Sequence, residues 1–173
     1  MDNQNRGARE KGAIGLFLPL IRGVVQERER RGCMAELPGE MYQVQTILDR
    51  YIAIHDNIFK FSLRKAIPIP GVFKAIDFGQ HFRELDSLTS ELEHLAISTN
   101  NRARVPSAFQ EYVAALLKTI QFLRDMCKRL YDKSEGDLQS YKMNQYKADV
   151  AMYEGLVDKY RLLGSALNEY IRK

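Results

Sequence analysis

The stretch from residue 107 to residue 133 constrains the fold more than any other part of this 173-residue chain. Its apolar side chains follow one another at alternating intervals of four and three residues, at Phe109, Val113, Leu116, Ile120, Leu123, Cys127 and Leu130. An α-helix has about 3.6 residues per turn, so this spacing places all of them on one face of a helix. The opposite face is mostly polar. The pattern therefore predicts a helix that packs its apolar face against other helices.

Three further stretches repeat this coiled-coil spacing. They run from about Pro38 to Lys65, from about Asp77 to the polar run 98–101, and from about Leu138 to Ile171. Their apolar faces comprise Val44, Ile47, Tyr51, Ile54, Ile58 and Phe61; Phe78, Phe82, Leu85, Leu88, Leu92 and Leu95; and Tyr146, Val150, Tyr153, Val157, Tyr160, Gly164, Leu167 and Ile171. No stretch shows the two-residue alternation of a strand, so we expect an all-α fold.

Local signals mark several helix ends. Asp77 with Gln80 three residues later resembles a capping box, and Gln110 stands at the same position in the helix that Pro106 opens. Ser134–Gly136 has the composition of a turn. Short connections favour antiparallel neighbours, and the sequence thus predicts an antiparallel up-down-up-down four-helix bundle over residues 36–173.

Residues 1–35 are expected to form a flexible basic extension with a short apolar helix. Residues 12–25 are the most hydrophobic stretch of the chain, but they are shorter than the roughly 20 apolar residues that span a membrane. Three interpretations of this segment remain open: a short helix that packs across the bundle, an amphipathic segment that lies on a membrane surface, or a segment that docks on a partner or a second copy. Its candidate contact residues are Ile14, Leu16, Phe17, Leu18, Leu20 and Ile21.

The net charge of +4 is unevenly spread along the chain. Residues 1–35 carry seven basic and four acidic side chains, residues 76–101 carry one and five, and residues 102–134 carry seven and three. We expect the acidic helix to lie beside the basic one. Because no basic run is interleaved with aromatic side chains, a nucleic acid is not an expected partner.

The two cysteines and the first histidine have simple interpretations. Cys127 stands on an apolar face and is predicted to be a small buried side chain, and with Cys33 as the only other cysteine no disulfide framework is implied. We therefore expect a reducing, cytoplasmic location, with a peripheral position at a membrane as the alternative. His55 stands next to Asp56, but adjacent residues on a helix do not face each other, so His55 is expected at the surface or the boundary of the core.

No residue pattern supports catalysis. A di-iron bundle needs two Glu-x-x-His motifs, and this chain has one, Glu91 to His94, which we expect to be a solvated pair. Neither a phosphate-binding glycine loop nor a nucleophile elbow is present in the sequence. We therefore predict that the protein is not an enzyme and uses no metal and no cofactor.

Three tyrosines recur at seven-residue intervals in the last helix, at Tyr146, Tyr153 and Tyr160. Buried tyrosine hydroxyls need water or a hydrogen-bond partner. Three interpretations remain open: the hydroxyls reach solvent at the rim of the core, a partner covers this face, or the three rings converge on a small-molecule cavity.

These patterns favour a non-enzymatic interaction module, a helical bundle that binds a protein partner or associates with itself. The alternative is a peripheral protein that acts at an anionic membrane surface through residues 12–25, which basic side chains flank on both sides. A third hypothesis, a small-molecule or enzyme site in the bundle centre, requires the tyrosines to surround a cavity.

Overall fold

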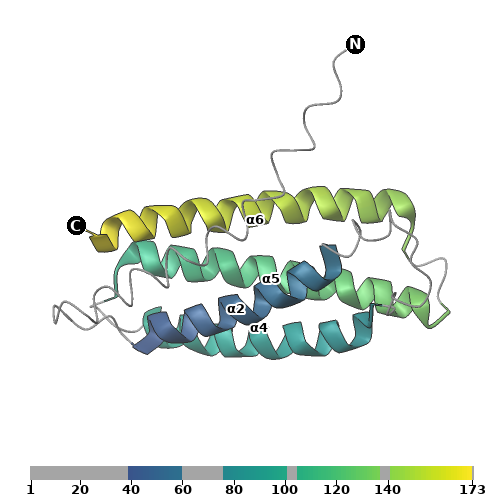
Figure 1. Cartoon of the computed structure of the whole chain (residues 1–173), viewed down its shortest axis with the longest axis horizontal. Helices are drawn as coiled ribbons and strands as arrows, with labels where there is room; N and C mark the ends of the chain where they lie inside the picture. Colours follow the sequence, from purple (N-terminus) through teal and green to yellow (C-terminus); the bar gives the residue numbers. More distant parts are fainter. Residues whose placement is uncertain (1–38, 60–75, 101–104, 137–140, 173) are drawn as a thin grey trace, which may run out of the picture.

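The computed structural model describes residues 39–59, 76–100, 105–136 and 141–172. This part of the chain forms four helices, α2 (Gly39–Phe59), α4 (Phe78–Asn100), α5 (Ser107–Ser134) and α6 (Met143–Arg172). They are long and pack side by side (Figure 1). The predicted all-α, four-helix fold is confirmed for these residues. The predicted N-terminal extension and its apolar helix lie outside the described residues.

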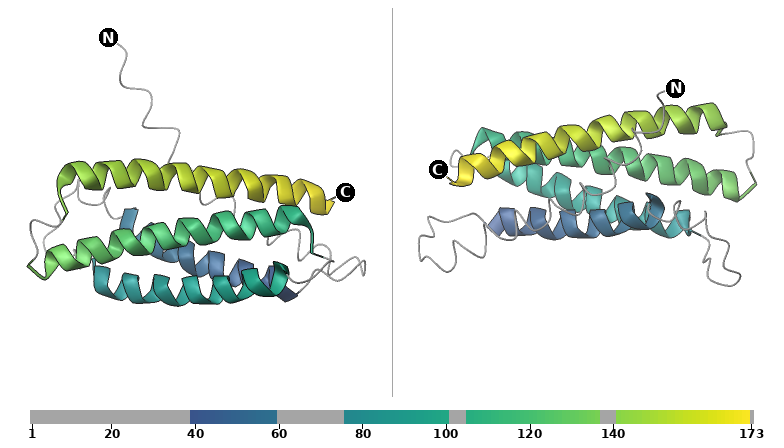
Figure 2. Two further views of the ribbon diagram at one scale, coloured as in Figure 1. Left: turned by 180° about the vertical axis from the view of Figure 1, so that it is seen from behind. Right: turned by 45° about the horizontal axis from the view of Figure 1, so that its top comes forward.

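Helix α5 is the centre of the packing. It contacts α4 and α6 closely, and α2 packs closely on α4. The left view of Figure 2 shows α5 between α4 and α6. The predicted apolar face of α5 is buried at Phe109, Val113, Leu116, Ile120, Leu123 and Cys127, and Leu130 at its end is partly exposed. The prediction that Cys127 is buried is confirmed.

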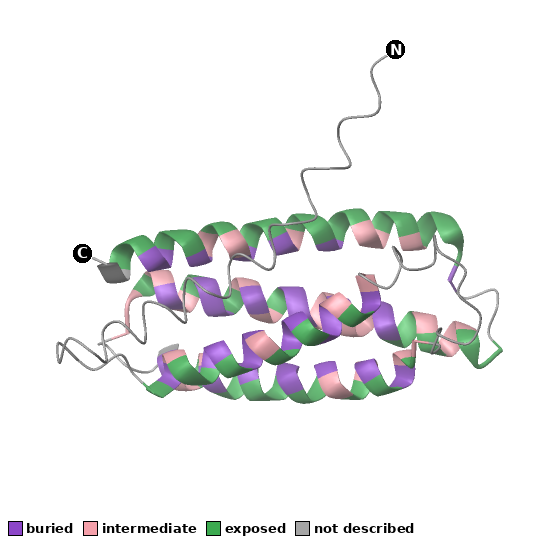
Figure 3. Ribbon diagram, viewed as in Figure 1, coloured by how far each residue is buried: buried purple, intermediate pink, exposed green. Residues whose placement is uncertain are grey.

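The other helices also turn their predicted apolar faces inward (Figure 3). The buried residues are Val44, Ile47, Tyr51, Ile54 and Ile58 on α2; Leu85, Leu88, Leu92 and Leu95 on α4; and Tyr153, Val157, Tyr160, Gly164 and Leu167 on α6. The aromatic residues Phe78, Phe82 and Tyr146 are partly buried against this core, as is Val150. Burial of these faces provides the main favourable free energy of folding.

The helix starts show where local signals succeed and fail. Asp77 caps α4 as predicted, because its Oδ1 accepts a hydrogen bond of 2.8 Å from the backbone N–H of Gln80. The cap predicted for Gln110 is not formed, since its side-chain amide donates to the carbonyl of Thr99 (3.3 Å) and Pro106 makes no side-chain cap. The turn after α5 is confirmed, with Gly136 at a φ of 116°.

The last helix begins at Met143, five residues after the predicted start at Leu138. Gln145 explains this start: its side-chain Oε1 accepts a hydrogen bond of 2.8 Å from the backbone N–H of Lys142. This is the half of a capping box in which the third helical residue reaches back to the residue before the helix.

Charge complementarity between α4 and α5 is confirmed. Arg124 of α5 lies 3.2 Å from a carboxylate oxygen of Asp86, and Gln121 donates to Glu93 over 2.9 Å. Arg50 joins α2 to α4 through a 2.7 Å contact with Glu91. Exposed pairs of this kind stabilise a fold by only about 0–1 kcal/mol each, so their main effect is on which helices pair.

Candidate functional site

A buried hydrogen-bonded cluster joins α2 to α6. The hydroxyl of Tyr153 lies 2.5 Å from the hydroxyl of Tyr51 and 2.6 Å from Nδ1 of His55. A tyrosine hydroxyl donates one hydrogen bond and also accepts, so both contacts are satisfied when Tyr51 donates to Tyr153 and Tyr153 donates to His55. The cluster therefore holds three polar groups inside an apolar core.

The burial of His55 corrects the sequence-based expectation of a surface or boundary residue. Polar side chains enter a core when a partner satisfies them there. The partner is Tyr153, which is 98 positions away in the sequence and belongs to another helix.

Aromatic rings fill the space around these hydrogen bonds. Tyr160 meets Tyr51 edge to face with ring centroids 6.1 Å apart, and Phe59 stacks on Tyr153 at 5.3 Å and 12°. The pairs of described helices whose backbones approach closely are α4 with α5, α5 with α6 and α2 with α4. The backbones of α2 and α6 are farther apart. Large side chains thus bridge a wide separation that smaller residues would leave open.

Burial sets the protonation state of this cluster. It raises the pKa of Tyr51 and of Tyr153 well above the usual value of a phenol, and it raises the pKa of Tyr160 to about 12. These hydroxyls stay protonated at neutral pH. They are suited to hydrogen bonding, whereas nucleophilic attack or proton abstraction would need a phenolate.

The three tyrosines of the heptad series take different places. Tyr153 and Tyr160 lie in the core. Their hydroxyls bond side chains of α2, Tyr51 and His55 for Tyr153 and Tyr51 for Tyr160, rather than solvent or a binding partner. Tyr146 is half-buried and lines a pocket that the other two do not reach. The rings therefore do not surround a common cavity in the described part of the chain.

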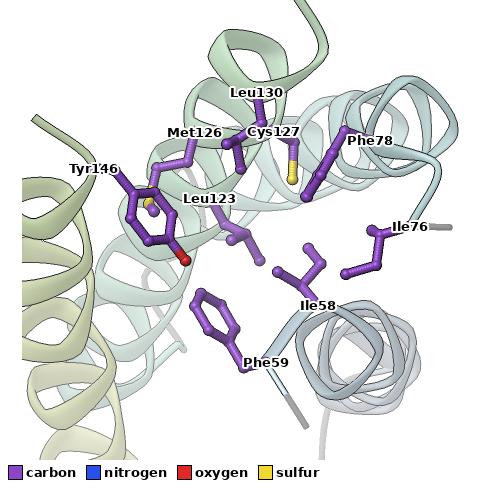
Figure 4. A pocket seen from close by; sticks show the side chains of 9 residues that line it. All are labelled: Ile58, Phe59, Ile76, Phe78, Leu123, Met126, Cys127, Leu130 and Tyr146. Carbon is purple, nitrogen blue, oxygen red and sulfur yellow. The ribbon is translucent and has the colours of Figure 1, made fainter. Parts of the chain in front are cut away.

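That pocket has a volume of about 140 Å³ and lies at one end of the bundle, near the end of α2 and the starts of α4 and α6. Its wall is made mainly of apolar side chains (Figure 4). All four helices or their flanking residues contribute to its wall, which comprises Ile58, Phe59, Ile76, Phe78, Leu123, Met126, Cys127, Leu130 and Tyr146. None of these residues is charged. Burial raises the pKa of the Cys127 thiol to about 12, so this thiol is neutral and unreactive at pH 7.

A third feature is on the outside, where α5 and α6 meet. Arg129 of α5 forms an ion pair with Asp149 of α6, and the hydroxyl of Thr119 donates to the carbonyl of Leu156 (3.3 Å). On each helix a row of residues at seven-residue intervals starts from this ion pair. The row on α5 comprises Phe122, Ala115 and Ala108, and the row on α6 comprises Leu156, Leu163 and Tyr170. We call these six residues and Met152 the outer seam.

The outer seam is apolar and incompletely covered. Its alanines, Phe122, Leu156 and Leu163 are half-buried, whereas Met152 and Tyr170 are 60% and 59% exposed. Residues four or seven apart lie on the same side of a helix, so Met152 adjoins Leu156. The seam thus consists of two apolar rows at the edge of the core.

The remaining candidate residues carry little chemistry. Glu91 and His94 are exposed as expected, and the Glu91 carboxylate accepts hydrogen bonds from Arg50 and Ser87. Within the described ranges no three His, Cys, Asp or Glu residues are grouped to hold a metal ion. None of the described helices is long and apolar enough to span a membrane. The candidate contacts between Ile14 and Ile21 lie outside the described residues.

Comparison of the chain with protein-family models, curated proteins and solved structures gives no match.

Proposed function

We propose that this protein is an interaction module whose helical bundle binds a helix of a protein partner, or of a second copy, along the outer seam of α5 and α6. The observation that carries the proposal is the pair of apolar rows at the edge of the core, in which two large side chains, Met152 and Tyr170, are more than half exposed. Helix-binding surfaces are typically contacted by apolar anchors at intervals of three, four and seven residues.

The proposal includes an antiparallel up-down-up-down order of the four helices. Its support for α5 and α6 is the pairing of Arg129 with Asp149 and of Thr119 with Leu156, because the residue number falls along α5 as it rises along α6. In this order the two rows of the outer seam run alongside each other. Ala108 and Ala115 on α5 then allow a partner helix to approach closely between the larger side chains of α6.

The exposed members of the seam are not needed for folding. Met152 and Tyr170 keep most of their surface in water, so the core is complete without them. Burying apolar surface under a partner is favourable by about 25 cal/mol per Å². The seam therefore offers binding free energy at little cost in the stability of the free protein.

Replacing Met152 by glutamate is expected to weaken association at least tenfold, because a carboxylate would have to leave water at an apolar contact. Size-exclusion chromatography with light scattering measures self-association, and pull-down with identification of captured proteins measures binding to a partner. Far-UV circular dichroism should show unchanged helix content, since Met152 is 60% exposed.

Met143 provides a matched control. It is a methionine of the same helix with 63% exposure, and it stands nine residues from Met152, which is half a turn away around the helix. Met143→Glu should leave association within about twofold of the unchanged protein, because a twofold change is less than 0.5 kcal/mol. Equal effects of the two variants would contradict the proposal, as would a strict monomer that captures no partner.

A further inference from the structure

We propose that the pocket at the end of the bundle is a binding site for a small neutral aromatic molecule that carries one hydroxyl group, a ligand of the size of phenol. This inference is independent of the outer seam, because the pocket and the seam share no residue. It rests on the volume, the wall and the polar groups of the pocket.

The volume fits a single six-membered ring. The pocket measures about 140 Å³. An enclosed cavity of about 150 Å³ lined by leucine, isoleucine and phenylalanine takes up benzene, so the volume of this partly open pocket is sufficient for one six-membered ring. Two fused rings with substituents would exceed this space, so the expected ligand is monocyclic.

The wall favours an aromatic ligand. Phe59, Phe78 and Tyr146 bring three rings from three different parts of the chain to the pocket, and their side chains surround the same space in Figure 4. Aromatic rings prefer stacked or edge-to-face neighbours and gain about 0.5–1.5 kcal/mol from them. Met126 adds a thioether, a group that also makes favourable contacts with aromatic rings.

The polar groups of the wall limit the ligand to a neutral one. The Tyr146 hydroxyl points into the pocket in Figure 4, between Leu123 and Phe59. The sulfur of Cys127 is also directed to this space. With no charged side chain in the wall, a carboxylate or ammonium group would lose hydration without an opposite charge to pair with. One ligand hydroxyl can exchange a hydrogen bond with Tyr146.

The pocket adjoins the buried cluster through Phe59. This ring forms part of the wall, stacks on Tyr153, and lies 4.8 Å from the His55 ring. A bound ring that fixes Phe59 would therefore also restrain the hydrogen bonds that join α2 to α6. Binding should stabilise the fold as well as fill the pocket.

The test is a titration of the full-length chain with phenol, followed by methyl NMR spectra and by thermal unfolding. We expect saturable shifts at the methyl groups of Ile58, Leu123 and Met126. At ten times its dissociation constant, phenol should raise Tm by about 3–5 °C. The absence of saturable shifts at these methyl groups would overturn the proposal, including the case in which another segment of the chain already fills the pocket.

Two pairs of variants make the site specific. Leu130→Phe fills the pocket from its partly exposed wall and should weaken phenol binding at least tenfold, whereas Leu162→Phe on the exposed surface of α6 should not change it. If the Leu130→Phe variant does not fold, the Tyr146→Phe variant tests the site instead. It should weaken binding of phenol about fivefold and leave binding of toluene unchanged, because only phenol shares a hydrogen bond with this hydroxyl.

Tyr170→Phe removes an exposed hydroxyl outside the pocket and is the control for Tyr146→Phe. Equal affinities of the Tyr146→Phe and Tyr170→Phe variants for phenol would overturn the assignment of the hydroxyl contact. Phenol binding that survives Leu130→Phe in a folded protein would place the ligand elsewhere and overturn the site.

Discussion

Replacing Leu116 by alanine is expected to lower the free energy of unfolding by about 3–4 kcal/mol, near the middle of the range for leucine truncations in packed cores. Leu116 has no exposed surface and stands midway along α5, the helix that contacts both α4 and α6. Because α4 and α6 both pack closely on α5, we expect little collapse around the missing methyl groups, so most of the cavity should remain. Urea unfolding followed by circular dichroism measures the loss.

Leu162→Ala is the control for this prediction. It makes the same chemical change on α6 at a side chain that is 73% exposed. Surface substitutions of this kind usually change stability by less than about 0.5 kcal/mol. Similar losses at the two positions would show that α5 does not occupy the centre of a packed core.

Removing one hydroxyl from the buried cluster has the second large effect. Tyr153→Phe keeps the ring that stacks on Phe59 but takes away the group that bonds Tyr51 and His55. Because two buried polar groups lose a shared partner at about 1–3 kcal/mol each, we expect a loss of about 2–4 kcal/mol in the free energy of unfolding. Urea unfolding of both proteins, with matched m-values, measures it.

Tyr112→Phe is the control that distinguishes the effect of losing hydrogen bonds from the effect of losing a buried hydroxyl group. Tyr112 is as buried as Tyr153, but its hydroxyl has no hydrogen-bond partner within the described part of the chain. Removing a buried polar group without a partner is expected to be neutral, or stabilising by up to about 1 kcal/mol. A loss as large as that of Tyr153→Phe would contradict the role assigned to the Tyr51–Tyr153–His55 hydrogen bonds.

Periodicity alone predicts much of this fold. The apolar intervals located α5 to within one residue at each end and identified the inward faces of all four helices. This works because burial depends on the angle of a residue around its helix, which spacing determines. The start of α6 was predicted five residues too early, since it depends on a side-chain cap from Gln145 that hydrophobic spacing does not reveal.

The buried cluster could be predicted only in part. Spacing put Tyr51, Tyr153 and Tyr160 on inward faces, but it cannot say which residue of one helix meets which residue of another. The adjacent residue Asp56 does not reveal the position of His55, because neighbours in sequence point to different sides of a helix. Tyr51, four residues earlier, lies one turn away on the same side. A polar side chain one turn from a buried tyrosine is the signal that could have found the cluster.

The pocket and the outer seam require the three-dimensional arrangement. The pocket forms where residues of α2, α5 and α6 meet the start of α4, and no local pattern predicts that their side chains leave a space between them. The outer seam depends on which flank of α6 faces α5, which the contacts of Asp149 and Leu156 decide. The membrane-surface alternative concerns residues 12–25 and stays a prediction.

Native-state amide hydrogen exchange tests most directly whether α5, which packs on both α4 and α6, is the most stable part of the bundle. The amides of residues 113–127 should exchange only through global unfolding, with a free energy of opening equal to that from urea unfolding. Leu116→Ala should lower both values by the same amount. If these amides instead open at a lower free energy than those of α4 or α6, the bundle is not organised around α5.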